Sequence, residues 1–364
     1  MSELNRARTN VRIRADILYR DQTVKYPDFQ GVTGGHITRS ASTRMRSSGS
    51  IEMINTGQDI DWLNDRLFLT YCYTVGGVDK ELPLGVLTLA NPTEDNFEDF
   101  EGEGKGDRLT VTASSPLQTL DGDAFETTFS VPQGANALAT AVGIVQDAGE
   151  FAISATPSDK TLSGMLVWEP GTSKLTIVNE LLAAINYWGL SVNRQGSLVL
   201  APYVDPGDRN TVFEFRSGVD SIRTPNRTRS VDMSAVCNKV ILVAQPEYSG
   251  GDLAPALVGV AANMDPKSPV SRPSLGRFIT YTKTGVEATD QATLNDLAMR
   301  ELKSRSAPTV ELQVEHVPVD LDANDVVYWT SETDDNIRCV VQDTTQSLEF
   351  PFLVTTNIEG VPFE

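Results

Sequence analysis

Apolar and polar residues alternate along several short segments in the first third of the chain. Between residues 11 and 19 nearly every second side chain is apolar, which is the pattern of a strand with one buried face. Further strand-like runs lie at residues 34–39, 50–55, 67–73, 82–89 and 109–112. Short strands separated by turns are typical of β-sandwiches and barrels. The pattern therefore predicts a first β-domain over residues 1–116.

The central part of the chain changes to a helical pattern. Apolar residues recur at spacings of three and four over residues 173–188, which predicts an amphipathic helix that ends before Gly189. Two apolar runs separated by a turn follow, so we expect a hairpin over residues 190–201. With a second, mostly apolar helix near residues 134–145, these elements predict a small α/β domain over residues 117–205.

From residue 206 the alternating pattern returns. Strand-like runs lie at residues 211–215, 238–244, 278–282, 309–315, 325–329, 337–341 and 352–356. They predict a second β-domain over residues 206–364. Residues 245–275 are rich in proline and glycine and are expected to form a long surface connection. A helix that begins near Thr289 completes an inserted loop and helix over residues 245–305. The whole chain is thus predicted to be mainly β with α+β insertions.

Charge narrows the classes of function. The net charge is −19, from 30 basic and 49 acidic residues, so the chain is not expected to bind DNA by neutralising phosphates. The first 50 residues carry nine Arg or Lys and four Asp or Glu, which is typical of a basic arm for an acidic neighbour and equally of solvated strand faces. No segment approaches the roughly 20 apolar residues of a membrane helix, and no signal peptide is visible. The three cysteines are odd in number and far apart, so we expect buried thiols and synthesis in a reducing cytoplasm.

Catalytic chemistry is not indicated. The two histidines, His36 and His316, are far apart, and no nucleophile elbow, zinc motif or phosphate-binding loop is present. The acidic tract 94–107 is expected to be an exposed loop and lacks the spacing of a helix-loop-helix calcium site, which leaves calcium binding there open. The sequence therefore predicts no enzyme, no cofactor and no metal site. Four tryptophans in different segments either anchor cores or line a sugar-binding face.

The order of these units resembles the tail hub, or minor tail, proteins of long-tailed bacteriophages and the related baseplate hub proteins of contractile tails. The resemblance is carried by short motifs spread over nearly the full chain, namely Leu82–Val86, Leu120–Asp123, Gly171–Ser173, Gly189–Val192, Gly196–Pro202, Asp232–Val240, Pro269–Ser271, Leu275–Arg277 and Pro318–Leu321. Their order and spacing are more specific than any one motif.

The resemblance implies a fold and an assembly. The β-domains 1–116 and 206–364 would be two similar, tube-forming β-barrels, and three chains would form a homotrimeric ring of six barrels. Such a pseudo-sixfold ring would join a sixfold tail tube to a threefold tail tip in the virion. Implied partners are a tail tube or distal tail protein, the tape measure protein, and tail-tip or fibre proteins. DNA would pass without specific binding, and this chain would not insert into a membrane.

Two sets of residues follow from this assembly. Acids that face the lumen would repel passing DNA, and we expect them to include Asp320, Asp322 and Asp325, although a solvated outer loop explains the same acidic run. Arg12 and Arg14 are expected to contact a neighbouring subunit. The alternative function is that of a carbohydrate-binding or adhesive β-protein of a tail tip or cell surface.

Overall fold

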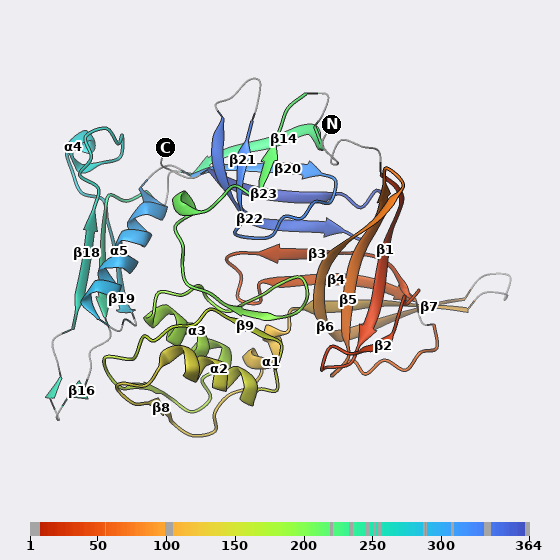
Figure 1. Ribbon diagram of the computed structural model, residues 1–364, viewed down its shortest axis with the longest axis horizontal. Coiled ribbons are helices and arrows are strands. Elements are labelled where there is room, and N and C mark those ends of the chain that lie inside the picture. Colours follow the sequence, from red (N-terminus) through yellow and green to blue (C-terminus); the bar gives the residue numbers. More distant parts are fainter. Residues whose placement is uncertain are drawn as a thin grey trace.

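A computed structural model describes residues 8–54, 56–98, 105–218, 221–232, 236–244, 248–249, 252–253, 256–286, 288, 290–306, 309–330 and 336–360. Figure 1 shows a large sheet flanked by a helical unit and by a smaller sheet with its own helix. Strands greatly outnumber helices, as the alternating sequence pattern predicts. Within the described residues no helix is both long and apolar enough to cross a membrane.

The first β region contains seven strands. These are β1 (Arg8–Leu18), β2 (Val24–Tyr26), β3 (Val32–Ser40), β4 (Ser47–Ile54), β5 (Arg66–Val75), β6 (Val78–Glu98) and β7 (Lys105–Ser114). Their inward side chains form one core, which includes Ile17, Ile51, Leu67, Leu87 and Val111. The acidic tract is not only a loop, because β6 continues to Glu98 and β7 begins at Lys105; residues 99–104 lie outside the described part.

The second β region follows residue 205 and has its own core around Phe215 and Trp329. Its elements are a 3-10 turn (Pro206–Asp208), β13 (Phe213–Phe215), β14 (Arg223–Asp232), β20 (Thr309–His316), β21 (Val326–Trp329), β22 (Ile337–Ser347) and β23 (Val354–Gly360). The predicted strands between residues 309 and 356 are all present here.

The two β regions share a single sheet of thirteen strands. Its main path is β14-β20-β23-β22-β3-β4-β7-β6-β5-β1-β2, and β22 pairs antiparallel with β3 from Asp343–Ser40 to Ser347–His36. The sequence pattern does not predict this pairing, because it joins strands from opposite ends of the chain. Among the described residues the path ends at β14 and β2, so the pairing does not close a barrel.

The central α/β unit lies below the large sheet in Figure 1. Its elements are α1 (Leu117–Asp121), β8 (Phe129–Val131), α2 (Ala137–Asp147), β9 (Ile153–Ala155), β10 (Leu166–Trp168), α3 (Lys174–Ala184), β11 (Ser191–Val192) and β12 (Leu198–Leu200). The predicted hairpin is present as β11 and β12. The helix predicted to reach residue 188 ends at Ala184, because Asn186 takes the left-handed conformation (φ 59°), which an α-helix cannot continue through.

The segment predicted as an inserted loop and helix forms a second small α/β unit together with the strand that precedes it. It contains β15 (Lys239–Ala244), β16 (Tyr248–Ser249), β17 (Asp252–Leu253), β18 (Val258–Ala262), α4 (Arg272–Leu275), β19 (Thr280–Val286) and α5 (Gln291–Arg305). Strands β18, β15 and β19 form their own sheet, so the surface connection expected over residues 245–275 is wrong in part. The helix cap is Asp290, and Thr289 lies outside the described residues.

Candidate functional site: an arginine–aspartate junction

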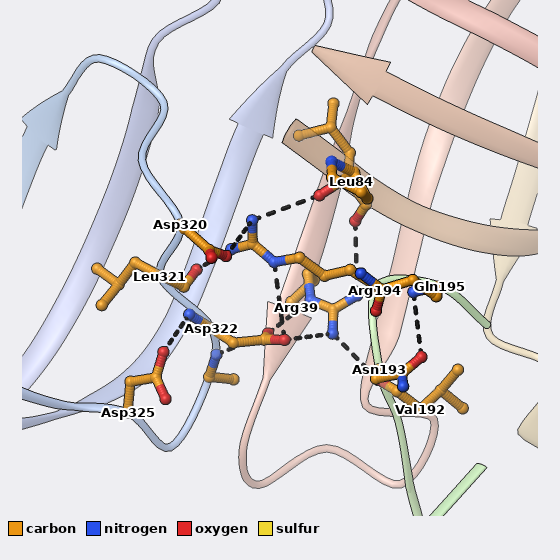
Figure 2. Close-up of polar contacts among 12 residues, drawn as sticks. Arg39, Leu84, Val192, Asn193, Arg194, Gln195, Asp320, Leu321, Asp322 and Asp325 are labelled. Carbon is orange, nitrogen blue, oxygen red and sulfur yellow. Dashed lines mark hydrogen bonds and ion pairs between the residues drawn. The ribbon is translucent and has the colours of Figure 1, made fainter. Parts of the chain in front are cut away.

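Three segments that lie far apart in the sequence meet at a cluster of charged side chains (Figure 2). Arg39 comes from β3 of the first β region, and Arg194 comes from the turn between β11 and β12. Asp322 lies in the loop between β20 and β21 of the second β region. The cluster therefore joins the two β regions and the central α/β unit, and we call it the arginine–aspartate junction.

Arg39 makes the central contacts of the junction. Its Nε donates to Asp322 Oδ1 at 2.7 Å and its Nη2 donates to Asp322 Oδ2 at 2.8 Å, which is a two-pronged ion pair. Nη2 also donates to the Val192 carbonyl at 3.0 Å, and Nη1 reaches the Leu84 carbonyl at 3.5 Å. Arg39 is only 9% exposed, so the pair is shielded from solvent on the arginine side.

Arg194 lies beside Arg39 and extends the junction. Its guanidinium donates to the carbonyls of Pro83 and Leu321, and it lies 3.5 Å from the Asp320 carboxylate and 3.7 Å from that of Asp322. Burial lowers the pKa of Arg194, and the negative charge of Asp322 opposes this shift. Because an arginine stays charged at any ordinary pH, the two aspartates balance a permanent positive charge.

The loop that carries these aspartates is fixed by its own hydrogen bonds. The Asp322 N–H donates to Asp325 Oδ2 at 2.6 Å, and the Ala323 N–H donates to Asp322 Oδ1 at 2.9 Å. Burial raises the pKa of Asp325, and the charge of Asp322 raises it further. Asn324 takes a left-handed conformation (φ 76°), which a short polar side chain tolerates well. The loop thus presents Asp322 to Arg39 in a defined orientation.

The three acids that we predicted to face a lumen have different environments. The side chain of Asp320 is 89% exposed, whereas that of Asp322 is 31% exposed and is bonded to Arg39. Asp325 is half-buried and caps the same loop. The remaining acids of the run, Glu332, Asp334 and Asp335, lie outside the described residues.

The arginines predicted to contact another subunit lie on β1 and already have partners within the chain. Arg12 pairs with Asp28 at 2.7 Å, and both side chains are about half exposed (51% and 50%). Arg14 pairs with Glu81 and lies 3.3 Å from Asp16. These pairs neutralise the positive charge locally, so the attraction for a neighbour that we expected from the basic segment is weakened.

Sequence reasoning missed Arg39 and Arg194. Arg39 occupies the same side of β3 as the buried Ile37, two residues earlier, so the strand period itself points this arginine inward. A charged residue at an inward position requires a buried partner, and this signal is readable in the sequence. The identity of the partner is not readable, because Asp322 is separated from Arg39 by most of the chain.

A cavity of about 290 Å³ borders the junction, and it is lined by residues that include Arg46, Trp188 and Asn324. The charged atoms of Arg39 and Asp322 there are already bonded to each other. In the part of the chain that the structure describes, no group of three or more His, Cys, Asp or Glu side chains is placed to hold a metal ion. The arrangement is therefore best suited to holding three parts of the chain together.

The two histidines have different environments, and the tryptophans are spread over different parts of the fold. His36 is exposed on β3, whereas His316 is 1% exposed and bonded to Thr356 Oγ1 at 2.8 Å. Trp168 and Trp329 are buried in two separate cores. Trp188 packs on Tyr203 with ring centroids 4.6 Å apart. The buried tryptophans are core anchors, and they do not form a shared sugar-binding face.

The whole fold matches that of bacteriophage tail proteins. A tail protein from Neisseria meningitidis aligns over 96% of both chains, with 12% identity and a TM-score of 0.63. The 43 kDa tail protein of a Shewanella oneidensis prophage aligns over 96% of this chain and 97% of its own, with 11% identity and a TM-score of 0.59. A Listeria monocytogenes prophage tail protein aligns over 95% and 94%, with 10% identity and a TM-score of 0.53.

At these identities the likeness is one of fold, and it extends over nearly the whole of each chain. No protein-family model and no curated protein matches the sequence. The resemblance to phage tail proteins that the short motifs indicate therefore agrees with the fold. Identity over the whole chain is too low to reveal this resemblance.

Proposed function

We propose that this chain is a structural tail hub protein of a bacteriophage, without catalytic activity. The observation that carries the proposal is the full-length likeness in fold to three tail proteins, two of them from prophages. The arrangement of charged groups at the junction is consistent with it, since they bond one another and stabilise the chain. The site of action would be the virion tail tip, after synthesis in the host cytoplasm.

In the proposed assembly, three copies form a ring with pseudo-sixfold symmetry. Each copy supplies two β regions, residues 1–116 and 206–364, which would occupy equivalent positions around the axis, and residues 117–205 would lie between them. A single chain with two equivalent surfaces can match a sixfold tube on one side and a threefold tip on the other. The partners would be a tube or distal tail protein, the tape measure protein, and tip or fibre proteins.

The lumen of this ring would let DNA pass without binding. The chain carries an excess of 19 negative charges, and like charge on a wall repels phosphates. Of the three acids first considered, Asp320 has the exposed carboxylate that this role needs. Asp322 and Asp325 would act indirectly, by fixing the loop on which Asp320 lies.

Electron microscopy of the purified full-length chain tests the proposal. We expect ring-shaped particles with threefold symmetry and a central hole, and a mass three times the 39.6 kDa of one chain. Compact particles without a hole, or a mass that stays at one chain at all concentrations, would contradict the ring. The carbohydrate-binding alternative predicts retention on immobilised glycans, which the tail hub proposal does not.

A further inference from the structure

The small sheet of the inserted unit is covered on one side only. Helix α5 packs on that side, where its Leu294, Leu297 and Ala298 bury Val240 and Leu242 of β15. Gly259 of β18 permits this close contact, because a Cβ atom there would lie 2.7 Å from the Leu294 carbonyl oxygen. The inner face of this sheet is thus a closed core.

The opposite face of the same sheet is apolar and exposed. Strand alternation and the pairing register place nine side chains on it, of which only one is charged: Val258, Val260, Ala262, Lys239, Ile241, Val243, Thr280, Thr282 and Thr284. Phe278, just before β19, joins them, because its ring centroid lies 5.0 Å from Lys239 Nζ. Val260 is 51% exposed, Val258 47% and Phe278 42%. We call these residues the outer face of the small sheet.

This outer face points away from the rest of the chain. Helix α5 lies between the sheet and the body of the molecule, since Arg300 donates to Asn186 Oδ1 at 3.2 Å and Lys303 donates to Asp205 Oδ2 at 2.9 Å. Figure 1 accordingly shows the small sheet at one end of the long axis. A contiguous apolar surface in this position is characteristic of a protein–protein contact.

The rim of the outer face indicates the charge of its partner. Lys239 and Arg272 both lie over the Phe278 ring, each 5.0 Å from its centroid. Neither forms an ion pair in the part of the chain that the structure describes. A partner with carboxylates beside an apolar surface would therefore complement it. This chain itself has that excess of acid, with 49 Asp and Glu against 30 Lys and Arg.

We infer that the outer face of the small sheet is a contact between copies of this chain, with apolar side chains at its centre and Lys239 and Arg272 facing carboxylates of the neighbouring copy. This inference rests on the proposed assembly of the chain in copies. It goes further by naming the surface, which lies on the small sheet inserted into the second β region and not on the large shared sheet.

Sedimentation velocity of the full chain over a concentration series tests this contact. Val260→Lys introduces a charge at the centre of the outer face, and we expect it to weaken self-association by about tenfold or more. The matched control is Val167→Lys, at a position that is 48% exposed on β10, outside both β regions of the ring, and it should leave self-association unchanged. Lys239→Glu should weaken it as well, because it places acid against acid.

The outcomes separate this contact from the tail hub proposal. Circular dichroism checks that each variant folds. If Val260→Lys does not fold, the smaller change Val260→Thr is measured in its place. Self-association that is equally strong in wild type and Val260→Lys, or a wild-type chain that stays monomeric, overturns the contact. If the wild-type chain forms a trimer that Val260→Lys does not weaken, the ring proposal stands and the contact is overturned. If the wild-type chain forms a dimer that Val260→Lys weakens, the contact is supported and the ring is contradicted.

Discussion

Arg39 and Asp322 are 283 positions apart in the sequence, yet their side chains form the two-pronged ion pair that joins the two β regions. Burying an arginine is costly unless a carboxylate compensates it. Removal of the Asp322 carboxylate should therefore destabilise the fold strongly, although Asp322 itself is partly exposed, because Arg39 is buried.

We expect Asp322→Asn to lower the free energy of unfolding by roughly 3 kcal/mol, because it leaves the buried Arg39 without a countercharge. Urea denaturation of the purified chain measures this. The control is Asp320→Asn, whose carboxylate is 89% exposed and should change stability by less than about 0.5 kcal/mol. Equal effects of the two substitutions would show that the junction is not a stabilising contact.

His316 gives a second prediction at this scale. Its Nδ1 lies 2.7 Å from the Val317 carbonyl, which can only accept, so Nδ1 carries the proton and Nε2 accepts from Thr356. Burial lowers the pKa of His316 from 6.5 to about 4. Between these values the unfolded chain binds more protons than the folded chain, so stability rises with pH.

The contribution of neutral His316 to the free energy of unfolding should be complete above pH 6.5 and lost as the pH falls to about 4. The loss over this range should be roughly 3 kcal/mol. Unfolding measured in urea at several pH values should show this slope in wild type and a smaller one in His316→Gln. The exposed His36 provides the control, since His36→Gln should keep the wild-type slope. Identical slopes in all three proteins would refute the prediction.

Among the elements, helix α3 shows how a strong periodic pattern predicts packing. Leu181 and Leu182 are fully buried in the core of the central α/β unit. Leu181→Ala or Leu182→Ala should lower the free energy of unfolding by roughly 2–5 kcal/mol, because each leaves a cavity. Thermal or urea unfolding measures this, with Val167→Ala at a 48% exposed position of β10 as the control. Unchanged stability in both leucine variants would mean that the core tolerates their loss.

Elements with a clear period could be predicted from the sequence, and elements that depend on tertiary context could not. The apolar spacing of residues 174–184 is sufficient to specify α3. Strand β18 lies in a segment rich in proline and glycine, and only its pairing with β15 makes it a strand. The motifs that suggested a phage tail protein agree with the fold, whereas the junction depends on long-range contacts that no local pattern carries.

For the whole molecule, the shared sheet predicts that the two β regions lose structure together. Strand β22 pairs with β3 on one side and β23 on the other, with Thr345 opposite Thr38 and Thr355. Thr345→Pro in this central strand should destabilise the chain by about 3 kcal/mol or more. Hydrogen exchange should then show faster exchange in β3 and β4 as well as in β23. Faster exchange confined to β22 and β23 would contradict the coupling.

The pairing of β22 with β3 also sets an order for synthesis. Thr38 and Thr345, whose hydroxyls are 2.9 Å apart, are separated by 307 positions. At about 5–20 residues per second, a ribosome needs roughly 15–60 s to make the intervening chain. Throughout that interval one edge of β3 lacks its partner, and such an edge is a template for pairing between nascent chains. Strand β22 therefore completes an edge that β3 leaves open, which makes the emergence of β22 from the ribosome the step that protects this protein from aggregation.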